Sequence, residues 1–230
     1  MASNSAVPVL HAESLSRHFG PGAVLDRVSL CLLEGTLTLL TGRNGSGKTT
    51  LVNCLAGFDR SYSGRVYFGG ESIDSAGPSK RARLGIVRTF QYPHLFDEFT
   101  VRDHLSLGRL ASVPALSSYF QQQWQQTEIQ STPKGVEDLY ARRGDELSFG
   151  EMKLVNTARA IATKPRVLLL DEPLASLDGE RRAIVVNAIL RIRDAGCSVL
   201  AVEHDLQDLL PIADAAFELT DGKMNDLRSK

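Results

Sequence analysis

The sequence has few of the features that mark secreted, membrane-spanning or metal-scaffolded chains. Its three cysteines, Cys31, Cys54 and Cys197, are odd in number, far apart and without metal-ligand spacing. We interpret each as a small reduced residue in or near the core of a cytosolic chain. No apolar run approaches the roughly 18 residues that span a bilayer. Residues 1–8 lack the basic and long apolar parts of a secretory signal, so we expect none.

The chain also lacks a strong charge of either sign. Its 26 basic and 27 acidic residues leave a net charge of −1, which gives no reason to expect a nucleic-acid partner or direct attraction to an anionic membrane. Internal repeats, long charge blocks and disordered linkers are absent too. What remains is 230 residues with 43% hydrophobic content, enough for one globular domain, or a domain with a subdomain, around a sizeable core.

A glycine-rich segment is the most informative feature that is present. Gly42–Thr49 fits the pattern G-x-x-x-x-G-K-[ST]; Thr36–Thr41 before it resembles a buried strand, and Thr50–Ala56 after it has helical spacing. In this context, backbone N–H groups converge on phosphate oxygens at a helix N-terminus. We expect Lys48 to contact the β- and γ-phosphates and Thr49 to ligate Mg²⁺. The sequence therefore predicts a nucleoside triphosphate site made by Gly42, Asn44, Gly45, Ser46, Gly47, Lys48, Thr49 and Thr50.

A second half-site follows a buried strand later in the chain. Val167–Leu170 is continuously apolar and leads into Asp171 and Glu172, and open α/β sheets bind ligands at the carboxyl ends of their strands. Asp171 suits a Mg²⁺ contact, and Glu172 could polarise an attacking water. Two acids after a strand are often only the start of a solvated loop, but the phosphate loop favours the catalytic interpretation.

The remaining pattern predicts an α/β core with an inserted helical region at about Tyr92–Lys164. Further strands are expected at Val7–Leu15, Val28–Leu33, Gly64–Phe68, Ile86–Gln91, Ser198–Val202 and Ala215–Leu219. Helices are expected from Thr100, with Asp103 as a capping partner, and at Gly150–Thr163, Arg181–Ala195 and Asp205–Ile212. Turns are expected at Gly69-Gly70 and Asp221-Gly222. An aromatic stripe, Tyr119, Phe120 and Trp124, is interpreted as local packing.

Leu147-Ser148-Phe149-Gly150-Glu151 resembles the LSGGQ signature of the ATP-binding cassette (ABC) family. Five other motifs stand in that family's order. Gly42–Thr50 resembles Walker A, Val167–Glu172 Walker B and Ala175–Asp178 the D-loop; Gln91 resembles the Q-loop glutamine and His204 the switch histidine. Phe19 stands where family members place an aromatic residue against adenine. The resemblance runs from Val9 to about Met224.

The resemblance implies a P-loop NTPase fold with a RecA-like core, an antiparallel β subdomain and a helical signature subdomain at about 92–164, within one domain at 7–227. It implies hydrolysis of ATP with Mg²⁺ between two cassettes, either a homodimer or a pair of homologues. Separate transmembrane permease subunits would hold the chain peripherally on the cytoplasmic face of the membrane. Implied catalytic residues are Glu172, His204, Gln91 and Lys48; implied metal ligands are Thr49, Gln91 and Asp171; implied signature contacts are Ser148, Phe149, Gly150 and Glu151.

Two signature residues depart from the family pattern. Phe149 replaces a glycine, and Glu151 replaces a glutamine. A carboxylate facing a γ-phosphate would weaken nucleotide binding, so we expect Glu151 to face away or to pair with a cation. Ser148 and the backbone of Gly150 still offer donors to phosphate at a helix N-terminus.

Val87–Gln91 with His94–Phe96 and Phe99–Val101 resembles the ATPases of branched-chain amino acid and urea uptake systems, and Tyr92–Phe99 is interpreted as a permease-docking surface. The middle region is shorter than in those proteins, and cargo and direction of transport stay open. The alternative is a soluble ABC ATPase that acts on a protein assembly, for example in iron–sulfur cluster biogenesis. A small-molecule kinase ranks lower, because it would leave the signature and D-loop unexplained.

Overall fold

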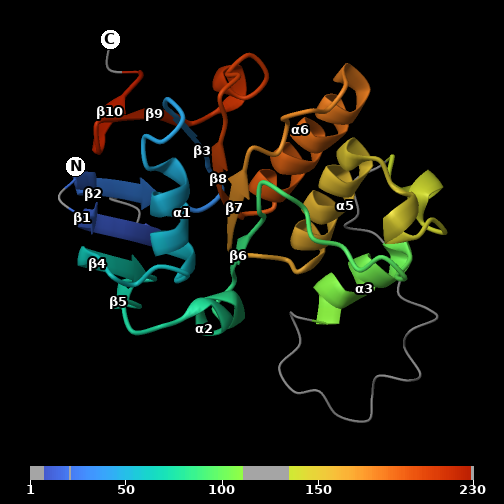
Figure 1. Cartoon of the computed structure of the whole chain (residues 1–230), viewed down its shortest axis with the longest axis horizontal. Helices are drawn as coiled ribbons and strands as arrows, with labels where there is room; N and C mark the ends of the chain where they lie inside the picture. Colours follow the sequence, from blue (N-terminus) through green and yellow to red (C-terminus); the bar gives the residue numbers. More distant parts are fainter. Residues whose placement is uncertain (1–7, 21, 111–134, 229–230) are drawn as a thin grey trace, which may run out of the picture.

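Two β-sheets and the helices between and beside them form the protein (Figure 1). The structure is a computed structural model, and it describes residues 8–20, 22–110 and 135–228. The expected Tyr119, Phe120 and Trp124 stripe lies outside the described residues. Within them, no helix is both long enough and apolar enough to cross a membrane.

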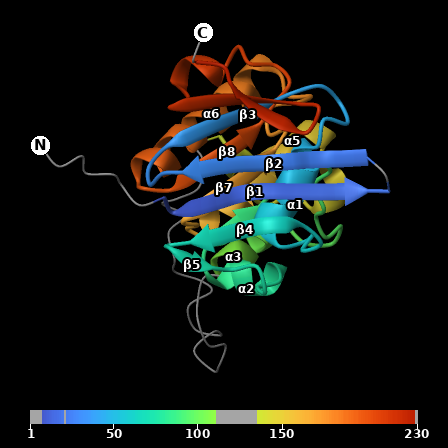
Figure 2. The same cartoon turned by 90° about the vertical axis from the view of Figure 1, so that its left-hand side faces the viewer.

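The first sheet is antiparallel and consists of four strands in the order β2-β1-β4-β5 (Figure 2). Its strands are β1 (Leu10–Phe19), β2 (Gly22–Leu32), β4 (Ser63–Phe68) and β5 (Glu71–Ser72). Alternate residues of β2 are buried, so Leu30 and Leu32 face the core while Cys31 between them is exposed. A core position for Cys31 was therefore wrong, whereas Cys54 and Cys197 are buried.

The second sheet has six strands in the order β10-β9-β3-β8-β7-β6. They are β3 (Leu37–Thr41), β6 (Ile86–Arg88), β7 (Val167–Asp171), β8 (Ser198–Val202), β9 (Ala215–Thr220) and β10 (Lys223–Asp226). All neighbouring pairs are parallel except β9 and β10, which form a hairpin through the expected Asp221-Gly222 turn. The carboxyl ends of β3, β6, β7 and β8 therefore meet at one edge of the sheet.

Both faces of this sheet are covered. On one face, α1 (Lys48–Ala56) lies between the two sheets and shares a core with Leu169 and Leu200. On the other face, α5 (Phe149–Ala162) and α6 (Gly179–Asp194) pack on Leu168 and Leu170. Successive residues of β7 thus enter opposite cores, which explains why the strand is apolar throughout.

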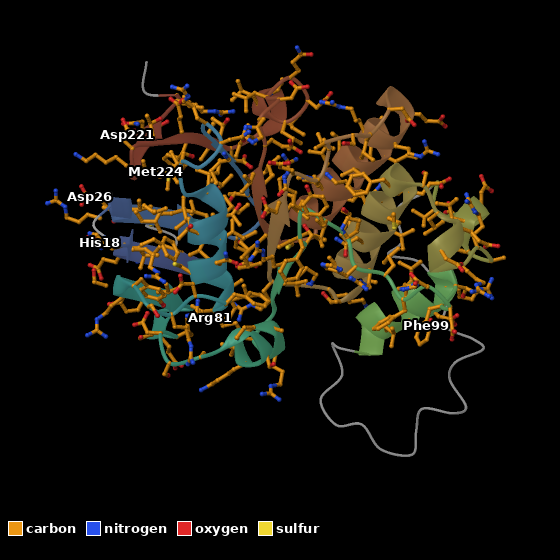
Figure 3. All side chains as sticks on the ribbon, viewed as in Figure 1. His18, Asp26, Arg81, Phe99, Asp221 and Met224 are labelled. Atoms are coloured by element: carbon orange, nitrogen blue, oxygen red, sulfur yellow. The ribbon has the colours of Figure 1, made fainter. Side chains whose placement is uncertain are left out.

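The remaining helices of the described residues are α2 (Pro78–Arg83), beside the end of α1, and α3 (Val101–Leu110), packed on α5. Short 3₁₀ helices span Glu137–Leu139, Gly144–Glu146 and Leu210–Ile212. Figure 3 places Arg81 of α2 beneath α1, and Phe99 at the far end of the molecule beside α3. Figure 3 also shows Asp26, Asp221 and Met224 together where β2 meets β10, and the Asp26 N–H donates to the Gly222 carbonyl there (2.8 Å).

Most predicted elements are confirmed with boundaries moved by a few residues. Thr100 and Asp103 form the expected cap before α3, with the Thr100 N–H donating to Asp103 Oδ2 (3.0 Å). The strand expected to reach Gln91 ends at Arg88. The helix expected at Asp205–Ile212 was wrong. There, Asp205 Oδ1 accepts the Gln207 N–H (3.1 Å) and starts a turn, and only the last three residues form a 3₁₀ helix.

Candidate functional site

The loop between β3 and α1 has a backbone shape that only glycine allows at its two ends. Gly42 has φ +145°, and a Cβ there would lie 2.3 Å from the Leu219 carbonyl oxygen. Gly47 has φ +104°, and its Cβ would lie 2.7 Å from the Val24 carbonyl oxygen. The two glycines therefore let the loop pass close to β9 and β2 before α1 begins at Lys48.

Lys48 is buried inside this loop. Its Nζ donates to the carbonyl oxygens of Gly42 (2.7 Å) and Arg43 (3.0 Å). Burial lowers the pKa of Lys48, while Glu172 and Asp171 act in the opposite direction. Nearby, Ser46 Oγ is the one buried side-chain oxygen or nitrogen without a hydrogen-bond partner among the described residues. A polyphosphate would supply the missing partner.

The other predicted loop residues lie at the surface. Arg43, Asn44 and Gly45 are exposed, Thr49 is exposed in the first turn of α1, and Thr50 is half-buried. Among the described residues, no three His, Cys, Asp or Glu side chains could hold a metal ion by themselves. A Mg²⁺ ion that takes most of its ligands from phosphate and water needs no such cluster.

Asp171 is buried at the end of β7, and it is paired with a cation that the sequence analysis did not single out. Arg88 Nη2 lies 3.1 Å from Asp171 Oδ2, with both side chains about 5% exposed. Arg88 also donates to Asn53 of α1 and lies 4.7 Å from the Phe90 ring centroid. The pKa of Asp171 lies above its usual value, because the effect of burial, which raises this pKa, outweighs the effect of Arg88, which lowers it. Arg88 thereby ties β6, β7 and α1 together beside the loop.

The structure brings Gln91, Glu172 and His204 together. Gln91 Nε2 donates to Glu172 Oε2 (2.8 Å), and His204 Nε2 lies 3.2 Å from Glu172 Oε1. Glu172 has φ +50°, a conformation that is sparsely populated by non-glycine residues and that often marks a functional position. These three predicted residues thus converge from β6, β7 and β8 on one carboxylate.

The predicted signature forms the N-terminus of α5. Ser148 caps the helix, because its Oγ accepts the Glu151 N–H (3.4 Å). In return, the Ser148 N–H and hydroxyl both donate to Glu151 Oε2 (2.8 Å each), which completes a capping box. Glu151 Oε1 accepts from Arg142 (2.9 Å) and lies 3.4 Å from Arg181 Nη2. The expected pairing of Glu151 with a cation is therefore confirmed. The pKa of Glu151 lies below its usual value. Burial, the largest single influence, raises this pKa, but the hydrogen bonds from Ser148 and the charge and hydrogen bond of Arg142 together outweigh it.

Comparisons with known proteins fit this arrangement. Residues 25–175 match the family described as ABC transporter. The Methanocaldococcus jannaschii probable branched-chain amino acid transport ATP-binding protein LivG is 34% identical, over 94% of this chain and 88% of that protein. The chain belongs to the ABC transporter family.

Further relatives agree with this membership. The Salmonella typhimurium high-affinity branched-chain amino acid transport ATP-binding protein LivG is 29% identical, over 94% of this chain and 89% of that protein. A solved nucleotide-free ATP-binding cassette is 33% identical with a TM-score of 0.78, over 94% of this chain and 89% of that one. The ABC cassette fold expected from the sequence is confirmed, and the chain is an ATP-binding, ATP-hydrolysing cassette. A soluble assembly ATPase finds no support among these relatives.

Within the cassette, the two aromatic residues predicted to contact nucleotide are both exposed. Phe149 is 39% exposed at the start of α5, and its ring lies 6.3 Å from that of Tyr92. Phe19 is 56% exposed at the end of β1, with the Arg17 guanidinium 4.2 Å from its ring centroid. Their contact with nucleotide stays a prediction. Gly150 packs against the D-loop, since a Cβ there would lie 3.5 Å from Leu177.

Two buried charged residues beside Glu172 were not predicted from the sequence as part of the site. Lys153 of α5 donates from Nζ to the Glu172 carbonyl oxygen (2.9 Å), and Glu203 Oε1 accepts the Leu174 N–H (2.7 Å). Burial, with the Glu172 charge, raises the pKa of Glu203 to about 7. Glu203 directly precedes His204, the predicted switch histidine, and this position was a usable signal. Lys153 stands in an ordinary amphipathic helix and gave no such signal.

Proposed function

We propose that this cassette energises the uptake of amino-acid-type solutes through separate permease subunits, which hold it peripherally at the membrane. The observation that carries the hydrolytic part is the Glu172 carboxylate held between Gln91 and His204. The uptake class rests on the relatives named LivG, which are branched-chain amino acid transport proteins. The resemblance of Val87–Gln91 to that subfamily supports the same assignment.

Glu172 acts as the residue that orients and polarises the attacking water. A carboxylate that accepts from Gln91 and contacts His204 is fixed in direction before substrate arrives. Lys48 leaves its two loop carbonyls to neutralise charge on the β- and γ-phosphates. Gln91 and His204 sense the γ-phosphate through the same carboxylate.

Mg²⁺ would be held by the Thr49 hydroxyl, Asp171 and the Gln91 amide oxygen. The residues present fit this ion, because they are oxygen donors of the kind that Mg²⁺ prefers. Gln91 donates to Glu172 through its nitrogen, so its oxygen remains an acceptor. When bound, the ion would neutralise charge that develops on the phosphates. Arg88 already contacts Asp171 Oδ2 and leaves Oδ1 for the ion or its water.

Two cassettes close head to tail on two ATP molecules. The phosphate loop and α1 belong to one core and the signature helix α5 to the other, on opposite faces of the six-stranded sheet (Figure 1). This separation supports contact between the signature and the nucleotide of a second cassette. A bacterial cassette solved as a dimer has the same fold, with a TM-score of 0.81 at 22% identity.

The permease docks on the segment after Gln91 within the helical region at 92–164. Tyr92, Phe96 and Phe99 are 67%, 58% and 40% exposed, and such an apolar patch beside a switch residue suits a protein partner. His104, fully buried, holds the segment by accepting the Phe96 N–H at Nε2 (2.8 Å). Leu95, expected from sequence on this surface, packs partly against the core instead. A docking variant therefore should change Tyr92 and Phe96 and leave Leu95 intact.

The dimer and the role of Glu172 are tested with Glu172→Gln, which keeps the side-chain shape but removes the base. We expect this variant to bind ATP, to hydrolyse it at least about a hundredfold more slowly, and to elute as a dimer in size-exclusion chromatography with MgATP. Glu71→Gln, on exposed β5, is the matched control and should remain active. An unchanged rate in Glu172→Gln would remove the assigned role, and a monomer under all conditions would remove the sandwich.

A further inference from the structure

Lys153 is a buried lysine that connects the signature helix to the catalytic segment of the same chain. It lies one helical turn after Phe149 and is 5% exposed. Its Nζ is 2.9 Å from the Glu172 carbonyl oxygen and 5.5 Å from the Phe149 ring centroid. The ammonium group thus contacts a signature side chain on one side and the backbone of the catalytic residue on the other.

The burial of this ammonium group needs a reason. Among the residues that the structure describes, no carboxylate oxygen lies within 4.0 Å of Lys153 Nζ, although Glu172, Glu203 and Asp171 are near enough to favour its charge. Burial lowers the pKa of Lys153 against these carboxylates. Burying a cation costs free energy, and the hydrogen bond that Lys153 donates goes to the Glu172 carbonyl oxygen. The buried lysine therefore serves to hold this carbonyl group.

The Glu172 carbonyl belongs to a residue whose backbone conformation is rare for a non-glycine residue. Glu172 has φ +50°, and its N–H donates to the Val202 carbonyl oxygen (2.9 Å). Lys153 holds the other end of the same residue. Both peptide groups of Glu172 are therefore anchored, which aims its carboxylate at Gln91 and His204. Loss of the Lys153 contact would leave this carbonyl with only the longer hydrogen bond from the Ala175 N–H (3.4 Å), and the carboxylate could then turn away.

We propose that Lys153 is a positioning residue that transmits contact at the signature to Glu172. This inference rests on the proposed head-to-tail dimer. In that dimer, Phe149 and Ser148 face the nucleotide held by the second cassette, whereas Glu172 of the same chain faces its own. A side chain that touches both Phe149 and Glu172 links the two ATP sites within one cassette.

The test compares Lys153→Met, which keeps the aliphatic length, with Lys153→Arg, which keeps a donor. Lys164→Met is the matched control, because Lys164 is an exposed lysine just after α5. We expect Lys153→Met to lower kcat about tenfold, with KM and the affinity for a fluorescent ATP analogue within about twofold of the unchanged chain. Its Hill coefficient for ATP hydrolysis should fall towards 1. Lys153→Arg should recover most of kcat, and Lys164→Met should lose none.

A second readout does not depend on hydrolysis. Amide hydrogen exchange of the peptide covering 171–176 in the nucleotide-free chain should become about tenfold faster in Lys153→Met and stay unchanged in Lys164→Met. Unchanged exchange, or faster exchange with unchanged kcat, would overturn the positioning role. If the unchanged chain does not hydrolyse ATP at all, the proposed function fails, while the exchange measurement still decides whether Lys153 holds Glu172. Should Lys153→Met not fold, Lys153→Leu, which also lacks a donor, takes its place.

Discussion

Replacing Glu203 with glutamine should make the cassette more stable at alkaline pH and leave it nearly unchanged at acidic pH. Glu203 is 3% exposed, and its Oε1 accepts the Leu174 N–H (2.7 Å). Its pKa rises from 4.5 to about 7, first because of burial and also because of the Glu172 charge. A glutamine keeps the accepting oxygen and cannot ionise, so it imitates the protonated acid.

The sign follows from which state holds the proton. Between pH 4.5 and about 7, the folded chain keeps the Glu203 proton and the unfolded chain has lost it. The folded state is therefore favoured fully below pH 4.5, and this contribution is lost as the pH rises towards about 7. The two pKa values lie about 2.5 pH units apart, which corresponds to about 3 kcal/mol in all, of which about 2.5 kcal/mol falls between pH 5 and pH 8.

Urea unfolding followed by circular dichroism at pH 5, 6, 7 and 8 measures this difference. The free energy of unfolding of Glu203→Gln minus that of the unchanged chain should grow by about 2.5 kcal/mol across the series. Taking the difference cancels groups that titrate equally in both chains. A difference that stays constant with pH, or that shrinks, would show that Glu203 is ionised in the folded cassette at neutral pH and would refute the reasoning.

Three further substitutions test other parts of the structure. Gly42→Ala should abolish ATP binding in equilibrium dialysis, because the added Cβ would lie 2.3 Å from the Leu219 carbonyl oxygen. In Gly45→Ala the added Cβ has no atom within 4 Å, so this variant should lose only about 1 kcal/mol of stability. Glu151→Ala should lower the free energy of unfolding by about 1 kcal/mol, measured in urea, because it removes the carboxylate that accepts from Ser148 in the capping box. Arg81→Met should lower it by about 3 kcal/mol or more, because Arg81 is fully buried and donates to four backbone carbonyls. Equal loss of ATP binding in Gly42→Ala and Gly45→Ala would contradict the account of the loop. An unchanged free energy of unfolding in Arg81→Met would contradict the account of Arg81.

The residues that could be predicted from sequence are those at strand ends. Parallel strands bring their carboxyl ends to one edge, so Gln91, Glu172 and His204 had to lie near one another once their strands were identified. Apolar runs identify such strands directly, because a sheet covered on both faces excludes polar residues from them. The proximity of these three residues could therefore be predicted from the sequence.

The contacts that could not be predicted join segments far apart in the chain through side chains with no local pattern. Arg88 and Asp171 are 83 residues apart and meet because β6 pairs with β7. The helix expected after Asp205 fails for a similar reason, since Arg182 of α6 pairs with Asp205 (2.8 Å) and Asp208 (2.5 Å) and holds that segment as a turn. Hydrophobic periodicity carries no information about such ion pairs.

The glutamate in the signature shows how a departure from a motif should be judged by its neighbours. Taken alone, Glu151 would add a negative charge where phosphate is expected to bind. In the structure Glu151 pairs with Arg142 and Arg181, and Arg181 also pairs with Asp178 of the predicted D-loop, so two carboxylates and two guanidinium groups form one cluster. The cluster is neutral, and the Glu151 carboxylate is turned back onto its own helix cap. The substitution therefore removes an amide donor from the signature without repelling the nucleotide, which favours retained ATP binding by this cassette.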